Sequence, residues 1–170
     1  MIVRPADLDE AGAIAQVHVS SWRSAYVDQV PQDYLDGLSV ATRRTAWRQL
    51  LSATDWPRTG ALVLVEDGQV VGFSHLGPSR DADCDETVGE MTSIYLLAEA
   101  WGRGAGRMLM NETVARLRTA GYKEAMLWVL DSNARARAFY EAGGWRHDGS
   151  AKIKDRGTFV LAELRYRLEL

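Results

Sequence analysis

The sequence has little of several features that would assign a protein class at once. Its single cysteine, Cys84, excludes an intramolecular disulfide and fits a reducing compartment. The three histidines are scattered without metal-like spacing, so we expect no metal site. No apolar run approaches the roughly 20 residues of a membrane span, and the start "MIVRPADLDE" has no apolar core of a signal peptide. These absences predict a cytoplasmic protein with no membrane contact.

An excess of basic residues is also missing. Lysine and arginine number 20 against 23 acidic residues, for a net charge of −3. Arginines cluster only locally, at 103/107 and 135/137, which gives no footprint of nucleic-acid binding. A chain of 170 residues that is 46% hydrophobic and 25% charged is long and apolar enough to bury a core. We therefore expect one domain over residues 1–170.

Local signals predict a mixed sheet covered by helices. Asp7 and Glu10 have the spacing of a capping box ahead of an amphipathic helix, and a second helix is expected over 40–52. Asp67-Gly68 predicts a tight turn between two strands. Further helices are expected over 104–120 and over 134–142, the second capped by Asn133, and two strands in the tail. The order β-α-α-β-β-β-α-β-α-β-β combines hairpins with strand–helix–strand crossovers, which indicates one α/β layer structure.

The segment "WGRGAG", residues 101–106, joins a β-prone run to a helix-prone run and has glycine at alternate positions. Glycine lets backbone N–H groups approach a ligand closely, and Arg103 and Arg107 indicate that this ligand is anionic. The nucleoside-triphosphate loop G-x-x-x-x-G-K-[ST] does not occur. A dinucleotide-binding loop fails as well, because its third glycine position falls on Arg107.

The spelling x-x-x-G-x-G between a strand and a helix resembles the pyrophosphate-binding loop of the GNAT acetyltransferase superfamily. The downstream segment "LWVLDSNARARAFYEAGGW" is similar to the second motif of that family, with Asn133 just before a helix and Tyr140 within it. Both segments lie within about 87–145. The resemblance implies an α/β fold with a mixed, mostly antiparallel central sheet, about four flanking helices and a splayed strand pair that binds the cofactor. Trp101 departs from the family, which usually has Gln or Arg there.

The cofactor that the resemblance implies is acetyl-CoA, with coenzyme A as the product. The first turn of the helix over 104–120 would offer unpaired N–H donors to the pyrophosphate. The strand over 91–97 would pair its exposed backbone with the pantetheine arm. The cofactor-binding residues carried over by position are Ile94, Tyr95, Leu96, Trp101, Gly102, Arg103, Gly104, Ala105, Gly106, Arg107 and Asn133.

Two residues match catalytic positions of the family. Glu90 corresponds to a carboxylate general base, which would take a proton from an amine that is almost fully protonated at neutral pH; the alternative is a carboxylate that faces solvent or pairs with an arginine. Tyr140 corresponds to the acid that protonates the departing thiolate; the alternative is an aromatic packing partner. No Ser/His/Asp set is present and Cys84 lies outside the motif strand, so we favour direct attack by the amine in a ternary complex.

The acceptor is expected to be a small amine or an amino-acid-like molecule, and a protein N-terminus or lysine is the alternative. Trp22, Tyr26 and Tyr34 either line the acceptor pocket or pack in the core. A non-catalytic module that binds acyl-CoA is the rival of another class. Relatives of this kind often dimerise, and strand edges near the C-terminus would allow a homodimer.

Overall fold

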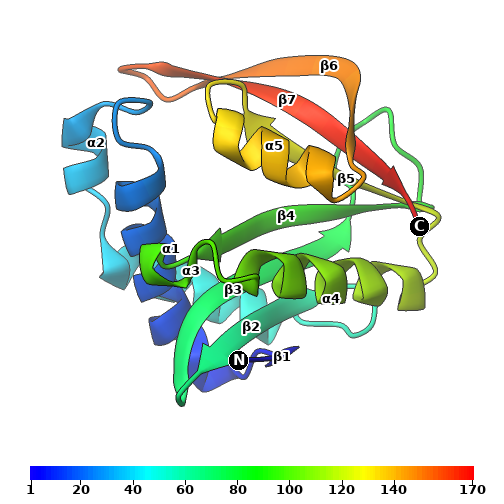
Figure 1. Ribbon diagram of the computed structural model, residues 1–170, viewed down its shortest axis with the longest axis horizontal. Helices are drawn as coiled ribbons and strands as arrows, with labels where there is room; N and C mark the ends of the chain where they lie inside the picture. The colour runs from blue at the N-terminus through cyan, green and yellow to red at the C-terminus, as the bar shows by residue number, and fades with distance from the viewer.

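A computed structural model describes residues 1–170, and its central feature is a seven-stranded sheet in the order β1-β2-β3-β4-β5-β7-β6 (Figure 1). The strands are β1 (Ile2–Pro5), β2 (Gly60–Glu66), β3 (Gln69–Pro78), β4 (Val88–Leu96), β5 (Glu124–Leu130), β6 (Arg146–Asp155) and β7 (Val160–Glu169). The helices are α1 (Ala11–Ala25), α2 (Gln32–Asp36), α3 (Val40–Ser52), α4 (Ala105–Thr119) and α5 (Ala134–Ala142), with short 3₁₀ turns at Leu8–Glu10 and Ala98–Ala100.

Only one neighbouring strand pair in the sheet is parallel. β4 runs parallel to β5, and every other pair is antiparallel, which confirms the predicted mixed, mostly antiparallel sheet. Asp67 and Gly68 both have positive φ, 50° and 78°, as a two-residue hairpin turn between β2 and β3 requires. The helix predicted over 40–52 is α3 with the same bounds.

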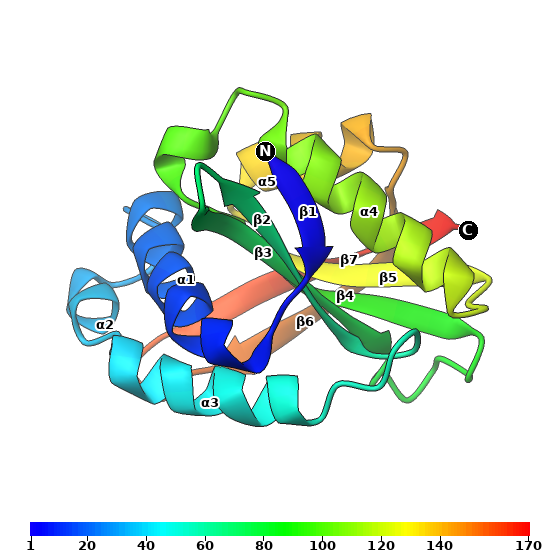
Figure 2. The same cartoon turned by 90° about the horizontal axis from the view of Figure 1, so that it is seen from below.

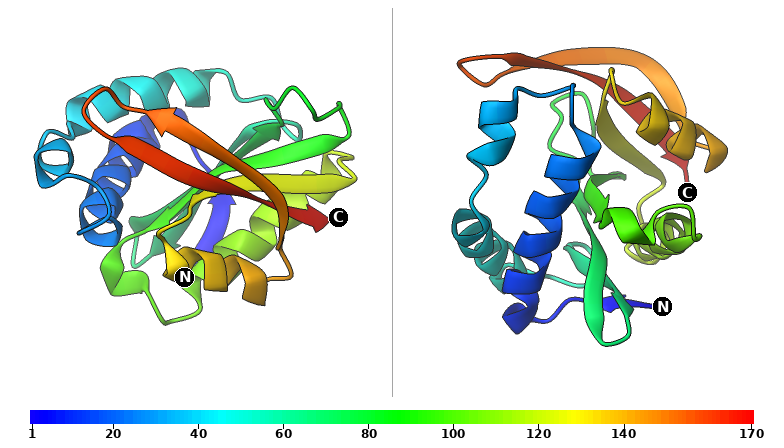
Figure 3. Two further views of the ribbon diagram at one scale, coloured as in Figure 1. Left: turned by 90° about the horizontal axis from the view of Figure 1, so that it is seen from above. Right: turned by 60° about the vertical axis from the view of Figure 1, so that its left-hand side comes forward.

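Helices cover both faces of the sheet, with α1 and α3 on one side and α4 and α5 on the other (Figures 2 and 3). The strand β2 shows why. Ala61 and Val63 pack in the cluster that includes α1 and α3, whereas Leu62 and Leu64 pack against Leu109 of α4. Because successive side chains of a strand point to opposite faces, an uninterrupted apolar run is what a strand covered on both sides needs.

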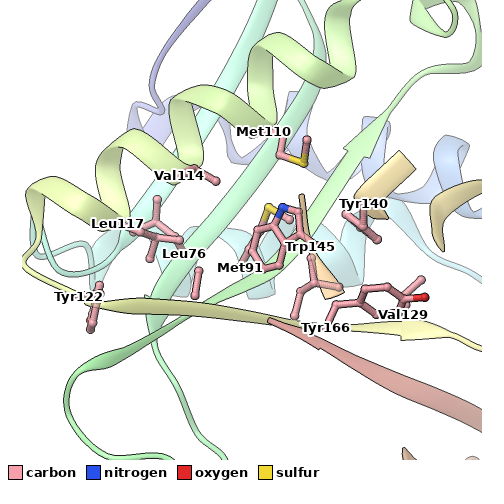
Figure 4. Close-up of a cluster of buried hydrophobic side chains, with 12 residues drawn as sticks. Leu76, Met91, Met110, Val114, Leu117, Tyr122, Val129, Tyr140, Trp145 and Tyr166 are labelled. Atoms are coloured by element: carbon pink, nitrogen blue, oxygen red, sulfur yellow. The ribbon is translucent and has the colours of Figure 1, made fainter. Parts of the chain in front are cut away.

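The largest core cluster lies between α4, α5 and the strands from β3 to β7, and Figure 4 shows it. Met110 and Leu117 of α4 meet Met91 of β4, and Trp145, which follows α5, is 1% exposed among them. Tyr140 of α5 belongs to the same cluster. The cluster therefore fixes α5 against the sheet, and with α5 the position of Tyr140.

The sequence did not predict α2, which lies in a stretch that reads as a turn-rich connection. The structure therefore has five helices where about four were expected. The five residues of α2 are too few to show a repeating apolar pattern in the sequence. The helix forms because Leu35 is completely buried against Trp22 and Val30. No helix of the chain has the length and apolar composition needed to cross a membrane.

Candidate active site

The site begins where β4 and β5 separate. The two strands pair only from Val88 to Glu90 on β4, and the last partners are Glu90 and Met126. Beyond this point β4 is bulged: His75 pairs with Ser93 and Leu76 with Met91, so that Thr92 has no partner on β3. A bulge bends and twists the strand that carries it. The bend turns the rest of β4 away from β5, and Glu90 lies at the resulting fork.

A cavity of about 940 Å³ occupies the fork. One end lies at the loop of residues 101–104 and the first turns of α4 and α5. The other end lies between α1, α3 and the hairpin of β6 and β7. This volume is at the upper end of the range for pockets that bury a small ligand. We refer to the two ends as the loop end and the acceptor end.

The loop end is built to receive an anion. Gly102 and Gly104 have φ values of 71° and 81°, and a Cβ at either position would meet no atom within 4 Å. Both positions thus need glycine for the backbone conformation, and the space beside each is open. Helical hydrogen bonding starts only with Met108 N–H to the Gly104 carbonyl, at 3.0 Å, which leaves the N–H groups of the first turn of α4 without helical partners. The helix dipole adds partial positive charge at this point.

Trp101 bridges this loop to both neighbouring elements. Its indole N–H donates to the Leu96 carbonyl at 3.2 Å, and the Arg135 guanidinium lies 3.5 Å from its ring centroid. Ser21 of α1 donates to the same Leu96 carbonyl at 2.8 Å. The residue that departs from the family pattern therefore holds the end of β4 and the start of α5 in place, and both line the cavity.

Two of the expected cofactor residues direct their side chains elsewhere. The Arg103 guanidinium forms a two-pronged ion pair with Glu66, at 2.7 and 2.9 Å, and is not among the groups that line the cavity. Ala105 is fully buried against β2. By contrast, Arg107 and Arg135 line the loop end. Arg107 and Arg135 therefore supply the cations beside the loop that the sequence assigned to Arg103 and Arg107.

The backbone of β4 offers a hydrogen-bonding edge to the cavity. The Leu97 N–H bonds to the Val71 carbonyl of β3 at 2.9 Å. Since successive residues of a strand turn their N–H and C=O groups to opposite sides, the groups of Ile94 and Leu96 face away from β3, toward the fork. The side chain of Asn133 accepts the N–H of Ala136 at 3.0 Å and caps α5, as predicted.

Glu90 is 5% exposed and lines the cavity at the fork. The Arg80 guanidinium donates to both carboxylate oxygens, at 3.2 and 3.3 Å, and hydrogen bonding to Glu90 raises the pKa of Arg80. The pairing with an arginine that the sequence left open is therefore present. Because the Arg80 side chain is 75% exposed, solvent can screen this ion pair. Arg80 lines the cavity together with Glu90.

Tyr140 approaches the cavity from α5. It is 8% exposed, packs against Phe139 and Trp145, and its hydroxyl has no protein hydrogen-bond partner. Burial raises the pKa of this phenol above its ordinary value, so that the hydroxyl is protonated at neutral pH. The ring packs in the core cluster and the residue also borders the cavity. The acid role of Tyr140 stays a prediction.

The acceptor end is aromatic. Trp22 of α1 and Tyr26, which follows that helix, line it with ring centroids 4.8 Å apart, and the Tyr95 ring of β4 completes the wall. Burial raises the pKa of Tyr26 and of Tyr95. Tyr34 lies behind this wall against Phe159, 4.9 Å between centroids, and does not border the cavity. The structure thus separates Tyr34, a packing residue, from the other two.

His18 also borders this end, as a packed residue. Trp47 Nε1 donates to its Nδ1 at 3.1 Å, and the ring stacks on Tyr95. Burial, aided by the charge of Arg43, lowers the pKa of His18 to about 4. His18 is therefore a neutral, hydrogen-bonded packing residue of α1.

Several charged groups of the cavity were not predicted from the sequence. Arg43 comes from α3, and Lys152, Lys154, Arg156 and Glu163 come from the β6–β7 hairpin, which folds over the acceptor end. No motif contains these residues, because α3 and the hairpin are distant in the sequence and border one cavity only in the folded chain.

Comparison with known proteins gives the same family as the sequence motifs. The model of the family described as "Acetyltransferase (GNAT) family" matches residues 20–145. The chain is 34% identical over 141 residues to the uncharacterized N-acetyltransferase YuaI of Bacillus subtilis, which covers 82% of this chain and 77% of the relative. Its fold is similar to that of the PaiA N-acetyltransferase from Thermoplasma acidophilum, solved with coenzyme A, with TM-score 0.76, 17% identity and coverage of 99% and 98%. The structure of yncA from Salmonella typhimurium with its cofactor acetyl-CoA has TM-score 0.73, 21% identity and coverage of 100% and 94%.

Proposed function

The chain belongs to the acetyltransferase (GNAT) family, and we propose that residues 1–170 act as one N-acetyltransferase domain that transfers the acetyl group of acetyl-CoA to a primary amine on a small molecule. The observation that carries this proposal is the continuity of the cavity. It joins an anion-binding loop at the N-terminus of α4 to a fork that holds Glu90 and Tyr140.

The residues at the loop end fit acetyl-CoA. The open space beside Gly102 and Gly104 and the free N–H groups of Ala105, Gly106 and Arg107 suit a pyrophosphate. Arg107 and Arg135 add charge-assisted hydrogen bonds. Asn133 and the β4 backbone at Ile94 and Leu96 would hold the pantetheine arm, with contact at Leu96 falling to its N–H, since its carbonyl already accepts two donors. Tyr95, also expected at the cofactor, pairs its backbone with β3 and stacks its ring on His18 instead.

When bound, acetyl-CoA supplies a thioester that is open to attack at its carbonyl carbon and has a thiolate leaving group. The chain's own groups then have distinct tasks. Glu90 receives, directly or through a water, the proton that the acceptor ammonium must lose, at a cost of roughly 4–5 kcal/mol at neutral pH. The Tyr140 hydroxyl, which is protonated at neutral pH, gives its proton to the sulfur. The amine attacks directly, because Cys84 does not line the cavity.

The test mixes the purified chain with acetyl-CoA and a panel of primary amines, and follows free thiol release. The panel contains amino acids, polyamines, aminoglycosides and short peptides with free N-termini. Thiol release that depends on a small acceptor supports the proposal. Release with peptides alone points to protein acetylation, and tight binding of coenzyme A without release in any well points to a non-catalytic binder.

A further inference from the structure

The acceptor end of the cavity carries more positive than negative charge. Two carboxylates, those of Glu90 and Glu163, border it. The cations that border it are Arg43, Arg80, Lys152, Lys154 and Arg156. These groups come from four separate segments, namely α3, β4, the loop after β3 and the β6–β7 hairpin, and the fold brings them together.

The carboxylates are already paired, and two of the cations are not. Glu90 accepts from Arg80, and Glu163 lies 3.0 Å from Lys154 and 3.7 Å from Lys152. Arg43 and Arg156 form no ion pair with any carboxylate of the chain. The acceptor end thus presents uncompensated positive charge to whatever enters it.

Trp22 forms the wall beside these cations. It is 9% exposed, its ring borders the cavity, and the Arg43 guanidinium carbon lies 6.0 Å from the ring centroid. The indole nitrogen itself is buried away from the cavity. A ligand at this end therefore meets the Trp22 ring and the Arg43 guanidinium.

We propose that the acceptor is a small primary amine that carries an anionic group, a carboxylate or a phosphonate, on the same molecule, and that Arg43 and Arg156 bind this group beside the Trp22 ring. The proposal rests on the proposed function and names its substrate class. The ammonium of such an acceptor is directed to Glu90, while its anion lies toward α3 and the hairpin. Acidic side chains that would attract a polycation are used elsewhere: Asp81 and Asp83 both bind Arg165.

The experiment uses the full chain and acceptors in matched pairs. Amino acids with different side chains and 2-aminoethylphosphonate are each paired with the corresponding uncharged amide or ester, and spermidine and a tetrapeptide are included. Turnover is followed by thiol release from acetyl-CoA. Binding of each acceptor in the presence of coenzyme A is followed independently by tryptophan fluorescence. The variants are Arg43→Gln and Arg156→Gln, with Arg48→Gln, an exposed arginine of α3 outside the cavity, as the matched control.

We expect the anionic member of at least one pair to have kcat/KM at least about tenfold above its uncharged partner. Arg43→Gln should remove most of this preference through KM, while kcat, coenzyme A binding and the Arg48→Gln control stay unchanged. A loss that is confined to the phosphonate, or to the carboxylates, identifies which anion the site takes.

Other outcomes overturn the inference. Equal or better turnover of the uncharged members, of spermidine or of the peptide would contradict it and leave the acetyltransferase proposal intact. Neither turnover nor binding of any anionic amine, with coenzyme A still bound, would contradict it as well. Failure to bind coenzyme A is a separate result, which would instead reject the proposed function.

Discussion

Two tyrosines of one core cluster allow catalysis to be separated from packing. Tyr140 and Tyr166 have ring centroids 6.4 Å apart, and both are labelled in Figure 4. The Tyr140 hydroxyl has no hydrogen-bond partner in the protein. The Tyr166 hydroxyl donates to Glu141 at 2.7 Å and accepts from Arg137 at 3.3 Å. Removing one oxygen from each ring therefore perturbs different properties of the protein.

Tyr140→Phe deletes a hydroxyl that makes no hydrogen bond in the free chain and borders the cavity. The free energy of unfolding should change by less than about 0.5 kcal/mol, whereas kcat should fall about 100-fold or more, because the thiolate loses its proton donor. Tyr166→Phe leaves the Glu141 carboxylate without its donor. We expect it to lose about 1–2 kcal/mol of stability, since Glu141 is exposed, and to keep its kcat.

The assays are urea unfolding and thiol release at saturating acetyl-CoA, with coenzyme A affinity measured by calorimetry for both variants. Full activity of Tyr140→Phe with intact coenzyme A binding would refute the acid role and leave Tyr140 as a packing residue. A large loss of stability in that variant would refute the reasoning about its unpartnered hydroxyl.

Further predictions concern the loop and His75. Gly104→Ala forces an alanine to φ 81°, which should cost about 1–2 kcal/mol of stability in urea unfolding and weaken coenzyme A binding in calorimetry. The control Gly68→Ala, at φ 78° in the β2–β3 turn, should cost as much stability without changing that binding, and equal affinities of the two variants would contradict the role of the loop. Arg107→Gln should raise the Kd for coenzyme A about tenfold, whereas Arg103→Gln should leave it nearly unchanged, because Glu66 of β2 holds the Arg103 side chain. If calorimetry found the larger effect for Arg103→Gln, Arg103 would have to turn to the cofactor. Burial, aided by the charge of Arg80, lowers the pKa of His75 from 6.5 to about 4, so between these pH values the unfolded chain binds a proton that the folded chain does not. The free energy of unfolding should therefore fall by at most about 3 kcal/mol from this residue as pH drops from 6.5 to 4. In urea titrations His75→Gln should show a smaller fall than the unchanged chain, and parallel pH profiles of the two would contradict the prediction.

The parts of the fold that the sequence predicted are those with local signals. The Asp67-Gly68 turn, the Asn133 cap and the bounds of α3 all depend on residues within a few positions of one another. The helix α2 escaped prediction, because five residues form a helix there only once Leu35 has a core to enter. Signals between neighbouring residues thus predict where an element begins or ends. The short helix α2 forms only through burial of Leu35 in the tertiary structure.

The candidate site divides in the same way. The glycines of the loop could be recognised, since their conformation and spacing are properties of adjacent residues. The direction of Arg103 could not, because its partner Glu66 lies 37 positions earlier, on β2. Nor could the cations of the acceptor end, because α3 and the β6–β7 hairpin border one cavity only in the folded chain. Contacts between side chains of separate elements therefore could not be predicted from the sequence.

The central claim is direct transfer of an acetyl group from acetyl-CoA to a small amine within the cavity. The most direct test is a single-turnover reaction with the chain in excess over acetyl-CoA, in which the masses of the amine and of the intact protein are both measured. The account predicts that one acetyl group appears on the amine and none on the protein. An acetyl group that accumulates on the protein at Cys84 before it reaches the amine, or an amine that is never acetylated while coenzyme A is bound, would contradict it.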